Sequence, residues 1–231
     1  MRGNTVVGVG DCDYGILVFD SENVTVENNT LRNCSLGLSG FVGNSNITYS
    51  GNTVTVSTIK GAAPFMNVEA GLDDKYKNIK IANNTFNFLG SVIAGATAPS
   101  IYIRGHGTEF SGNTIIGASS VESMGRSVKL INNSLQDIST LAVSVNGANT
   151  EVRGNSIHHV GYVSFASGNG IEVKANNCVV ANNLFSHDSL NTLPPELIGK
   201  KLVSAVLLAP NLAKGSYVID NIHPSDVRLV S

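Results

Sequence analysis

Residues 23–34, NVTVENNTLRNC, contain the phrase that decides the fold, because similar phrases return along the chain. Each copy has two apolar residues separated by a polar one, then Asn, then Thr or Ser and a further apolar residue. Other copies are NITYSGNTV, NIKIANNTF, SVKLINNSL and TEVRGNSI. After alignment, the Asn that ends the first apolar segment falls at Asn4, Asn29, Asn52, Asn84, Asn113, Asn133, Asn155, Asn183 and, less clearly, Asn221. The average step of about 27 residues is typical of a solenoid repeat.

Each repeat unit is predicted to contain strands, because its apolar residues have a period of two. Val24 and Val26, and later Ile79 and Ile81, alternate with polar residues. The Asn or Gly that follows tolerates the left-handed backbone conformation of a sharp turn. A further short apolar segment precedes most copies, so each unit has about three strands. The sequence therefore predicts an all-β fold, a parallel β-helix of about eight or nine coils.

The repeated Asn is predicted to be structural. Strands of neighbouring coils would lie about 4.8 Å apart, so equivalent Asn side chains can form a ladder of amide hydrogen bonds. A buried Asn is costly unless it is paired, and a ladder pairs it. Leucine-rich repeats also use an Asn ladder, but their length is nearly constant and they need leucines in a returning helix. The variable spacing and the Gly-rich, β-branched return segments favour the β-helix.

The composition narrows the classes of partner. The formal net charge is −2 and no block of Lys or Arg occurs, so no nucleic-acid partner is expected. No run of 18 apolar residues is present, so no membrane-spanning segment is predicted, and the first residues do not resemble a signal peptide. The widely separated Cys12, Cys34 and Cys178 are predicted to be reduced or buried.

From Asn4 to about Asn221 these motifs resemble the right-handed parallel β-helix superfamily, the pectate-lyase-like fold. The resemblance implies a right-handed helix with its coils over residues 1–190. Because the chain opens at the corner of a coil, we expect this helix to be truncated at its N-terminus. Residues 188–203, with Pro194 and Pro195, interrupt the rhythm. We therefore expect residues 191–231 to form a loop excursion, a last coil and a closing segment.

The same resemblance implies a polysaccharide partner, because the superfamily includes polysaccharide lyases, glycoside hydrolases, uronate epimerases and phage tailspikes. We expect a polysaccharide-binding or depolymerising module of a tailspike-like protein. Such a module would be a homotrimer, at the virion surface or extracellular. Two alternatives remain open at this point: a monomeric bacterial lyase, hydrolase or epimerase, and a non-catalytic structural or adhesion solenoid.

Candidate site residues come from one sheet, because members of this superfamily usually work on the outer face of one sheet and its loops. We expect these first-strand residues to point inward: Ile16, Leu38, Val68, Ile103, Val143 and Val173. Their outward neighbours Glu69, Arg104 and Glu122, on three consecutive coils, are the candidate catalytic residues. The two carboxylates would lie about 9–10 Å apart, near the upper limit for an inverting pair. The candidate substrate-binding residues are Asn67, Tyr102, Glu172 and Lys174.

The same outward residues allow two other readings. A lyase would place Arg104 or Lys174, with Tyr102, beside the carboxylate and α-proton of a uronate. Alternatively, a row of mixed charge merely keeps the sheet soluble.

No cofactor and no metal are expected. Asp11 and Asp13 have the i, i+2 spacing of a calcium loop and are the candidate ligands if calcium binds. The motif occurs once, which favours an ordinary turn. His158 and His159 are adjacent, but the sequence indicates no third ligand beside them.

Overall fold

A computed structural model describes residues 1–8, 14–34, 36–40, 43–57, 66–68, 78–89, 98–160, 169–186, 204–225 and 227–230. These described residues form strands and turns and contain no helix. The strands make three sheets, and every recorded strand pairing is parallel. The predicted all-β fold of parallel strands is therefore confirmed.

Sheet I has nine strands and sheets II and III have eight strands each. Sheet I consists of β2 (Tyr14–Val18), β5 (Leu36–Gly40), β8 (Met66–Val68), β11 (Ile101–Ile103), β14 (Val121–Ser123), β17 (Val143–Val145), β20 (Asn169–Val173), β23 (Ser204–Leu208) and β25 (Arg228–Val230). Sheet II consists of β3 (Thr25–Glu27), β6 (Ile47–Ser50), β9 (Ile79–Ala82), β12 (Glu109–Ser111), β15 (Lys129–Ile131), β18 (Glu151–Arg153), β21 (Val179–Ala181) and β24 (Tyr217–Ile219). Sheet III consists of β1 (Thr5–Val7), β4 (Thr30–Arg32), β7 (Thr53–Val56), β10 (Thr85–Phe88), β13 (Thr114–Ile116), β16 (Ser134–Ile138), β19 (Ser156–Val160) and β22 (Leu184–Ser186).

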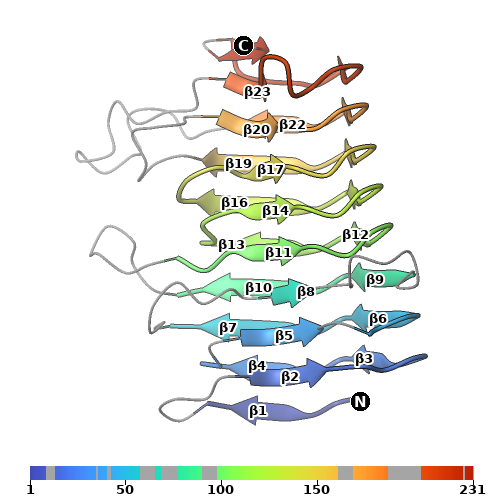
Figure 1. Cartoon of the computed structure of the whole chain (residues 1–231). Coiled ribbons are helices and arrows are strands. Elements are labelled where there is room, and N and C mark those ends of the chain that lie inside the picture. Colours follow the sequence, from blue (N-terminus) through green and yellow to red (C-terminus); the bar gives the residue numbers. More distant parts are fainter. Residues whose placement is uncertain are drawn as a thin grey trace.

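From β1 to β24 the chain adds one strand to each sheet in turn, and β25 then returns to sheet I. It passes from β1 in sheet III to β2 in sheet I and β3 in sheet II, and then returns to sheet III as β4, which pairs with β1. Repetition of this path stacks the strands in layers, with the two termini at opposite ends of the stack (Figure 1). The arrangement is compatible with a parallel β-solenoid. The predicted boundary at residue 190 lies outside the described residues, and β23 and β24 extend the same sheets beyond it.

The interior is filled by columns of inward-pointing side chains that are in register from strand to strand. The column from sheet III is Leu31, Val54, Phe86, Ile115, Leu135, Ile157 and Phe185. The column from sheet II is Val26, Tyr49, Ile81, Phe110, Leu130, Val152 and Val180. Each fully buried aliphatic side chain contributes about 1.5–3 kcal/mol relative to an exposed one. The apolar residues that recur with a period of two in the sequence are therefore the ones that point into the core.

The inward positions predicted for sheet I are buried wherever their side chains are described. These residues are Ile16, Leu38, Ile103, Val143 and Val173. Val68 belongs to β8, and its side chain lies outside the described part of the chain.

The nine aligned asparagines are joined by hydrogen bonds from one layer to the next. In each pair, the side-chain Nδ2 of one Asn donates to the Oδ1 of the next, at 2.8 to 3.0 Å. The series runs through Asn4, Asn29, Asn52, Asn84, Asn113, Asn133, Asn155, Asn183 and Asn221. Each interior amide also accepts from the backbone N–H of the preceding Asn and donates to a backbone carbonyl, as Asn113 does to Ile81. The buried amides are therefore fully used.

The residue before each of these asparagines has a positive φ and alternates between Asn and Gly for most of the stack. These residues are Gly3, Asn28, Gly51, Asn83, Gly112, Asn132, Gly154, Asn182 and Asp220. A Cβ atom on Gly112 would lie 2.5 Å from Oδ1 of Asn83, and Gly51 and Gly154 have the same relation to Asn28 and Asn132. The Asn side chain of one layer thus occupies the space that a Cβ atom would need at the equivalent position of the next layer. This explains why that next position is Gly.

Removal of one interior amide is expected to destabilise the stack. Asn113→Ala removes the oxygen that accepts from both the side-chain amide and the backbone N–H of Asn84. It also removes the amide that donates to the carbonyl of Ile81 and to Oδ1 of Asn133. We expect the free energy of unfolding, measured in urea, to fall by about 2–4 kcal/mol. The matched control is Asn4→Ala at the exposed end of the series, which should cost less than about 1 kcal/mol. Equal losses in the two variants would contradict a stabilising role for the buried series.

The steric reason for Gly at alternate corners can be tested with two alanine variants. Gly107 (φ 65°) and Gly112 (φ 63°) share a left-handed backbone, but a Cβ on Gly107 would meet nothing within 4 Å. Gly107→Ala should therefore cost about 1 kcal/mol of backbone strain, and Gly112→Ala about 1 kcal/mol more. Adding Asn83→Gly to Gly112→Ala should recover the additional loss in a thermal or urea melt. The explanation fails if both alanine variants lose the same stability.

Candidate functional site

The outer face of sheet I carries a row of polar side chains on four adjacent strands. Tyr102 on β11 is the register partner of Glu122 on β14, which pairs with Ser144 on β17, which in turn pairs with Glu172 on β20. Tyr102, Glu122 and Glu172 alternate with buried residues along their strands, so their side chains point outward. Ser144 has the equivalent position on β17 but is itself buried. The four strands lie one above another in the middle and upper part of the stack (Figure 1). We call Tyr102, Glu122, Ser144 and Glu172 the sheet I row.

Each carboxylate of the sheet I row has a polar neighbour. Nζ of Lys174 lies 2.6 Å from Oε2 of Glu172, whose side chain is only 17% exposed. Oγ of Ser120 donates to Oε1 of Glu122 at 3.1 Å. The row is therefore an ordered polar surface in which both acids are held in place.

A cation also lies beside the aromatic end of the sheet I row. The guanidinium of Arg104 lies 5.5 Å from the ring centre of Tyr102, a distance at which a cation is attracted to the ring face. Arg104 itself is exposed, and Tyr102 is half-buried. A cation and an aromatic ring are thus presented together at this edge of the surface.

The two carboxylates of the row have a spacing that matters for chemistry. Glu122 and Glu172 are two strands apart, with Ser144 between them, so their backbone positions are about 9–10 Å apart. Inverting glycosidases hold their two carboxyl groups about 6.5–9.5 Å apart, which leaves room for a water molecule. The backbone spacing is thus close to the upper end of that range. This pair is therefore the strongest candidate for acid–base work on the described surface.

The structure places the predicted residues in two rows rather than one. Tyr102, Glu122 and Glu172 belong to the sheet I row, whereas Arg104 and Lys174 follow the last residues of β11 and β20 and lie beside it. Their predicted roles stay predictions, because placement alone does not test them.

Two predicted residues cannot be placed in full. Asn67 is the backbone partner of Tyr102, but its side chain is not among those described, and Glu69 lies outside the described residues. The predicted Glu69–Glu122 separation therefore stays a prediction. Among the described residues, Glu122 has Glu172 as its acidic partner in the row. The sequence analysis predicted that Glu172 also points outward from this sheet, but it assigned Glu172 to the substrate-binding residues and not to the catalytic ones.

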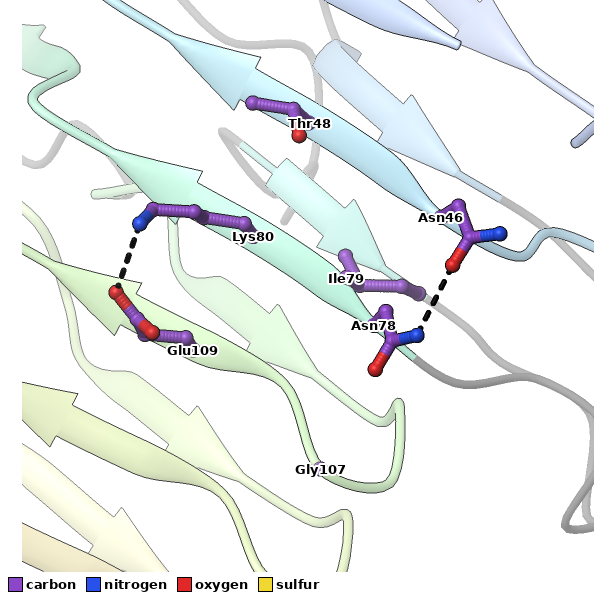
Figure 2. A pocket seen from close by; sticks show the side chains of 7 residues that line it. All are labelled: Asn46, Thr48, Asn78, Ile79, Lys80, Gly107 and Glu109. Carbon is purple, nitrogen blue, oxygen red and sulfur yellow. Dashed lines mark hydrogen bonds and ion pairs between the residues drawn. The ribbon is translucent and has the colours of Figure 1, made fainter. Parts of the chain in front are cut away.

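A second polar surface lies on the outer face of sheet II, and the sequence analysis did not single it out. Lys80, Glu109, Lys129 and Glu151 are successive register partners on β9, β12, β15 and β18, so charges of opposite sign alternate. Beside them is a hollow of about 380 Å³, lined by Asn46, Thr48, Asn78, Ile79, Lys80, Gly107 and Glu109 (Figure 2). The sequence does contain a signal for this surface: the strands that begin with NITY (46–49) and NIKI (78–81) are followed by one that begins with GTEF (107–110), in which Gly replaces Asn.

Glu109 is held in its charged form within this hollow. Oγ of Ser111 donates to its Oε1 at 2.8 Å, and Nζ of Lys80 lies 3.4 Å from the same oxygen. The hydrogen bond from Ser111 is the largest cause that lowers the pKa of the Glu109 carboxyl, and the charges of Lys80 and Lys129 lower it further. Lys80 and Glu109 thus form a compensated ion pair (Figure 2).

The remaining candidates add no metal site within the part of the chain that the structure describes. Asp11 and Asp13, the possible calcium ligands, lie outside the described residues. Nδ1 of His158 is 2.9 Å from Oγ of Ser186, and Nδ1 of His159 is 2.8 Å from Oδ1 of Asp137. Within the described ranges, no group of three or more His, Cys, Asp or Glu side chains could hold a metal ion. The same ranges contain no helix that is long and apolar enough to span a membrane.

Comparison with known protein families, with curated proteins and with solved structures finds no match to this chain. The functional argument therefore depends on the residues and on their geometry.

The cause of the low pKa of Glu109 is testable by titration. We expect its carboxyl to titrate below 4.5, the ordinary value for Glu, when followed by carbon-detected NMR. Ser111→Ala and Lys80→Met should each raise this pKa, because each variant removes a group that favours the charged carboxylate. An unchanged pKa in both variants would contradict this explanation.

Proposed function

We propose that the chain is a right-handed parallel β-helix of about eight or nine coils with an asparagine ladder, related to the pectate-lyase-like superfamily. Two observations support the proposal. Successive strands enter three parallel sheets in a fixed order, and nine equivalent asparagines are hydrogen-bonded in series. The variable length of the unit, from 20 to 38 residues between equivalent asparagines, is also typical of this superfamily rather than of leucine-rich repeats.

The function that we propose is binding and depolymerisation of a polysaccharide, as in a phage tailspike-like protein. The sheet I row is the observation that carries this proposal, because Glu122 and Glu172 lie on one face with a backbone spacing near the upper limit for an inverting pair. Lys174, Arg104 and Tyr102 flank them with two cations and one aromatic ring. Such a surface suits an extended polymer that carries carboxylates, and no buried pocket is needed for it.

The proposed reaction uses the two acids in different roles. Glu172, held by Lys174, accepts a proton from a water molecule whose oxygen forms a bond to the anomeric carbon. Glu122 donates its proton to the glycosidic oxygen as the bond from that oxygen to the anomeric carbon breaks. The products are two shorter chains, one of them with an inverted anomeric centre. Arg104 would orient a substrate carboxylate beside the Tyr102 ring.

Non-catalytic glycan binding is the second candidate function. The observation in its favour is the 2.6 Å ion pair between Glu172 and Lys174, since each group already satisfies the other. In either case we propose a homotrimer at the virion surface or in the extracellular space, by analogy with tailspikes.

The proposal is tested by turnover of bacterial capsules, O-antigens and uronate polymers. Chain length, reducing ends and ultraviolet absorbance together separate hydrolysis from lyase cleavage. We expect Glu122→Gln to lower turnover at least about 100-fold, because a general acid is lost. Glu151→Gln, on the outer face of sheet II, is the matched control and should leave turnover unchanged.

Three results would decide between the candidate functions. Full turnover by Glu122→Gln would remove Glu122 from the mechanism. Binding without any cleavage, weakened by Lys174→Met, would favour the non-catalytic function. Neither binding nor cleavage across the panel would count against a carbohydrate-directed role.

A further inference from the structure

A second series of asparagines runs along the outside of sheet II. Asn23, Asn46 and Asn78 stand just before β3, β6 and β9, and all three have a positive φ. Nδ2 of Asn46 donates to Oδ1 of Asn23 at 3.0 Å, and Nδ2 of Asn78 donates to Oδ1 of Asn46 at 3.0 Å. We call these three residues the outer asparagine series. Unlike the buried series, its members are exposed to solvent.

The outer asparagine series stops at Gly107. Glu109 is the register partner of Lys80, so Gly107, two residues earlier, stands opposite Asn78. The backbone of Gly107 has the same left-handed conformation as the asparagines, and a Cβ placed on it would meet nothing within 4 Å. An asparagine would therefore fit at this position, and its amide is the group that the series lacks.

The interruption leaves a hydrogen-bond acceptor that faces the hollow. Figure 2 shows the carbonyl oxygen of Asn78 turned away from Asn46. Within the described part of the chain, no hydrogen bond to this oxygen is recorded beyond the Asn78–Asn46 pair, in which Asn78 is the donor. The hollow that begins here has a volume of about 380 Å³ and extends to the Lys80–Glu109 pair. Ligand sites in proteins commonly have volumes of about 300–1,000 Å³.

The groups that line the hollow match the chemistry of hydroxyl groups. Oδ1 of Asn78 and the carboxylate of Glu109 accept hydrogen bonds, the ammonium of Lys80 donates them, and the hydroxyl of Thr48 does both. Lys80 and Glu109 compensate each other, so the hollow favours a neutral ligand over an ion. Among the described residues that line it there is no aromatic side chain, so we expect no ring stacking from them and weak binding.

We infer that this hollow binds a neutral polyhydroxylated ligand of the size of one sugar ring, with one hydroxyl donating to Asn78 where the next asparagine amide would otherwise lie. The site is on sheet II, whereas the residues proposed for polysaccharide cleavage are on sheet I. It therefore does not depend on Glu122 or Glu172, and it can be tested separately.

The test uses the full chain, labelled with ¹⁵N, and two probes, methyl α-D-glucopyranoside and methyl α-D-galactopyranoside. Shifts of the Asn78 side-chain amide and of the Gly107 backbone amide are followed by NMR. We expect at least one probe to give saturable shifts with a dissociation constant of about 1–10 mM, the range of a few neutral hydrogen bonds. Glu109→Gln should weaken that binding about 10-fold, because a charge-assisted hydrogen bond is lost.

The decisive variant is Gly107→Asn, which continues the outer asparagine series and fills the hollow. It should lower the affinity for the probe at least about 10-fold, the effect of losing one good hydrogen bond, while thermal stability is retained or rises. Gly3→Asn is the matched control, because Gly3 also has a φ of 65° and open space around its Cβ position. It should leave binding unchanged.

Several outcomes would overturn the inference. These are the absence of saturable shifts with both probes, shifts confined to residues away from the hollow, and unchanged binding by a folded Gly107→Asn chain. Measurement in the Glu122→Gln variant separates the two proposals. Probe binding there should equal that of the parent chain, whatever happens to polysaccharide turnover.

Discussion

Hydrogen bonds between equivalent asparagine amides are the interaction on which the rest of the structure depends. At the corner between sheets II and III the backbone turns too sharply for a continuous strand ladder. The amides of the buried series bridge this gap by joining each layer to the next through side chain and backbone together. A buried amide without a hydrogen-bond partner would be costly, so an asparagine in one layer needs an asparagine at the equivalent position of the next layer. This explains why the series extends from Asn4 to Asn221.

The corner also imposes a constraint on its neighbours. The residue before each buried asparagine must adopt a left-handed backbone, which restricts it to Asn, Asp or Gly here. An Asn at that position projects over the next layer, and Gly then provides the space, as Asn83 and Gly112 illustrate. At the start of the sheet II strands, Gly107 stands in the layer after Asn78. Here a Gly after an Asn leaves an open hollow, whereas at the buried corner the Asn side chain fills the space above the Gly.

The scaffold serves function by holding outward side chains at the spacing of the strands. Nothing about the sheet I row requires a loop to be ordered, because Glu122, Ser144 and Glu172 are paired residues of adjacent strands. Their backbone spacing is therefore as constant as the sheet itself. The chemistry that we propose depends on this regular spacing and on the cations beside it, Lys174 and Arg104.

Local pattern in the sequence was sufficient to predict the all-β fold and the inward faces, because both follow from apolar residues with a period of two. It also predicted the turns, because each needs one Asn or Gly that tolerates a left-handed backbone. Pairing between layers was not predictable in the same way, since the connections vary in length and only backbone hydrogen bonds set the register. The tertiary structure alone therefore decided which outward residues are direct register partners, so that Glu122 and Glu172 lie in line with Ser144 while Lys174 lies beside them. It also decided that Gly107 stands opposite Asn78, so that a missing side chain leaves a hollow.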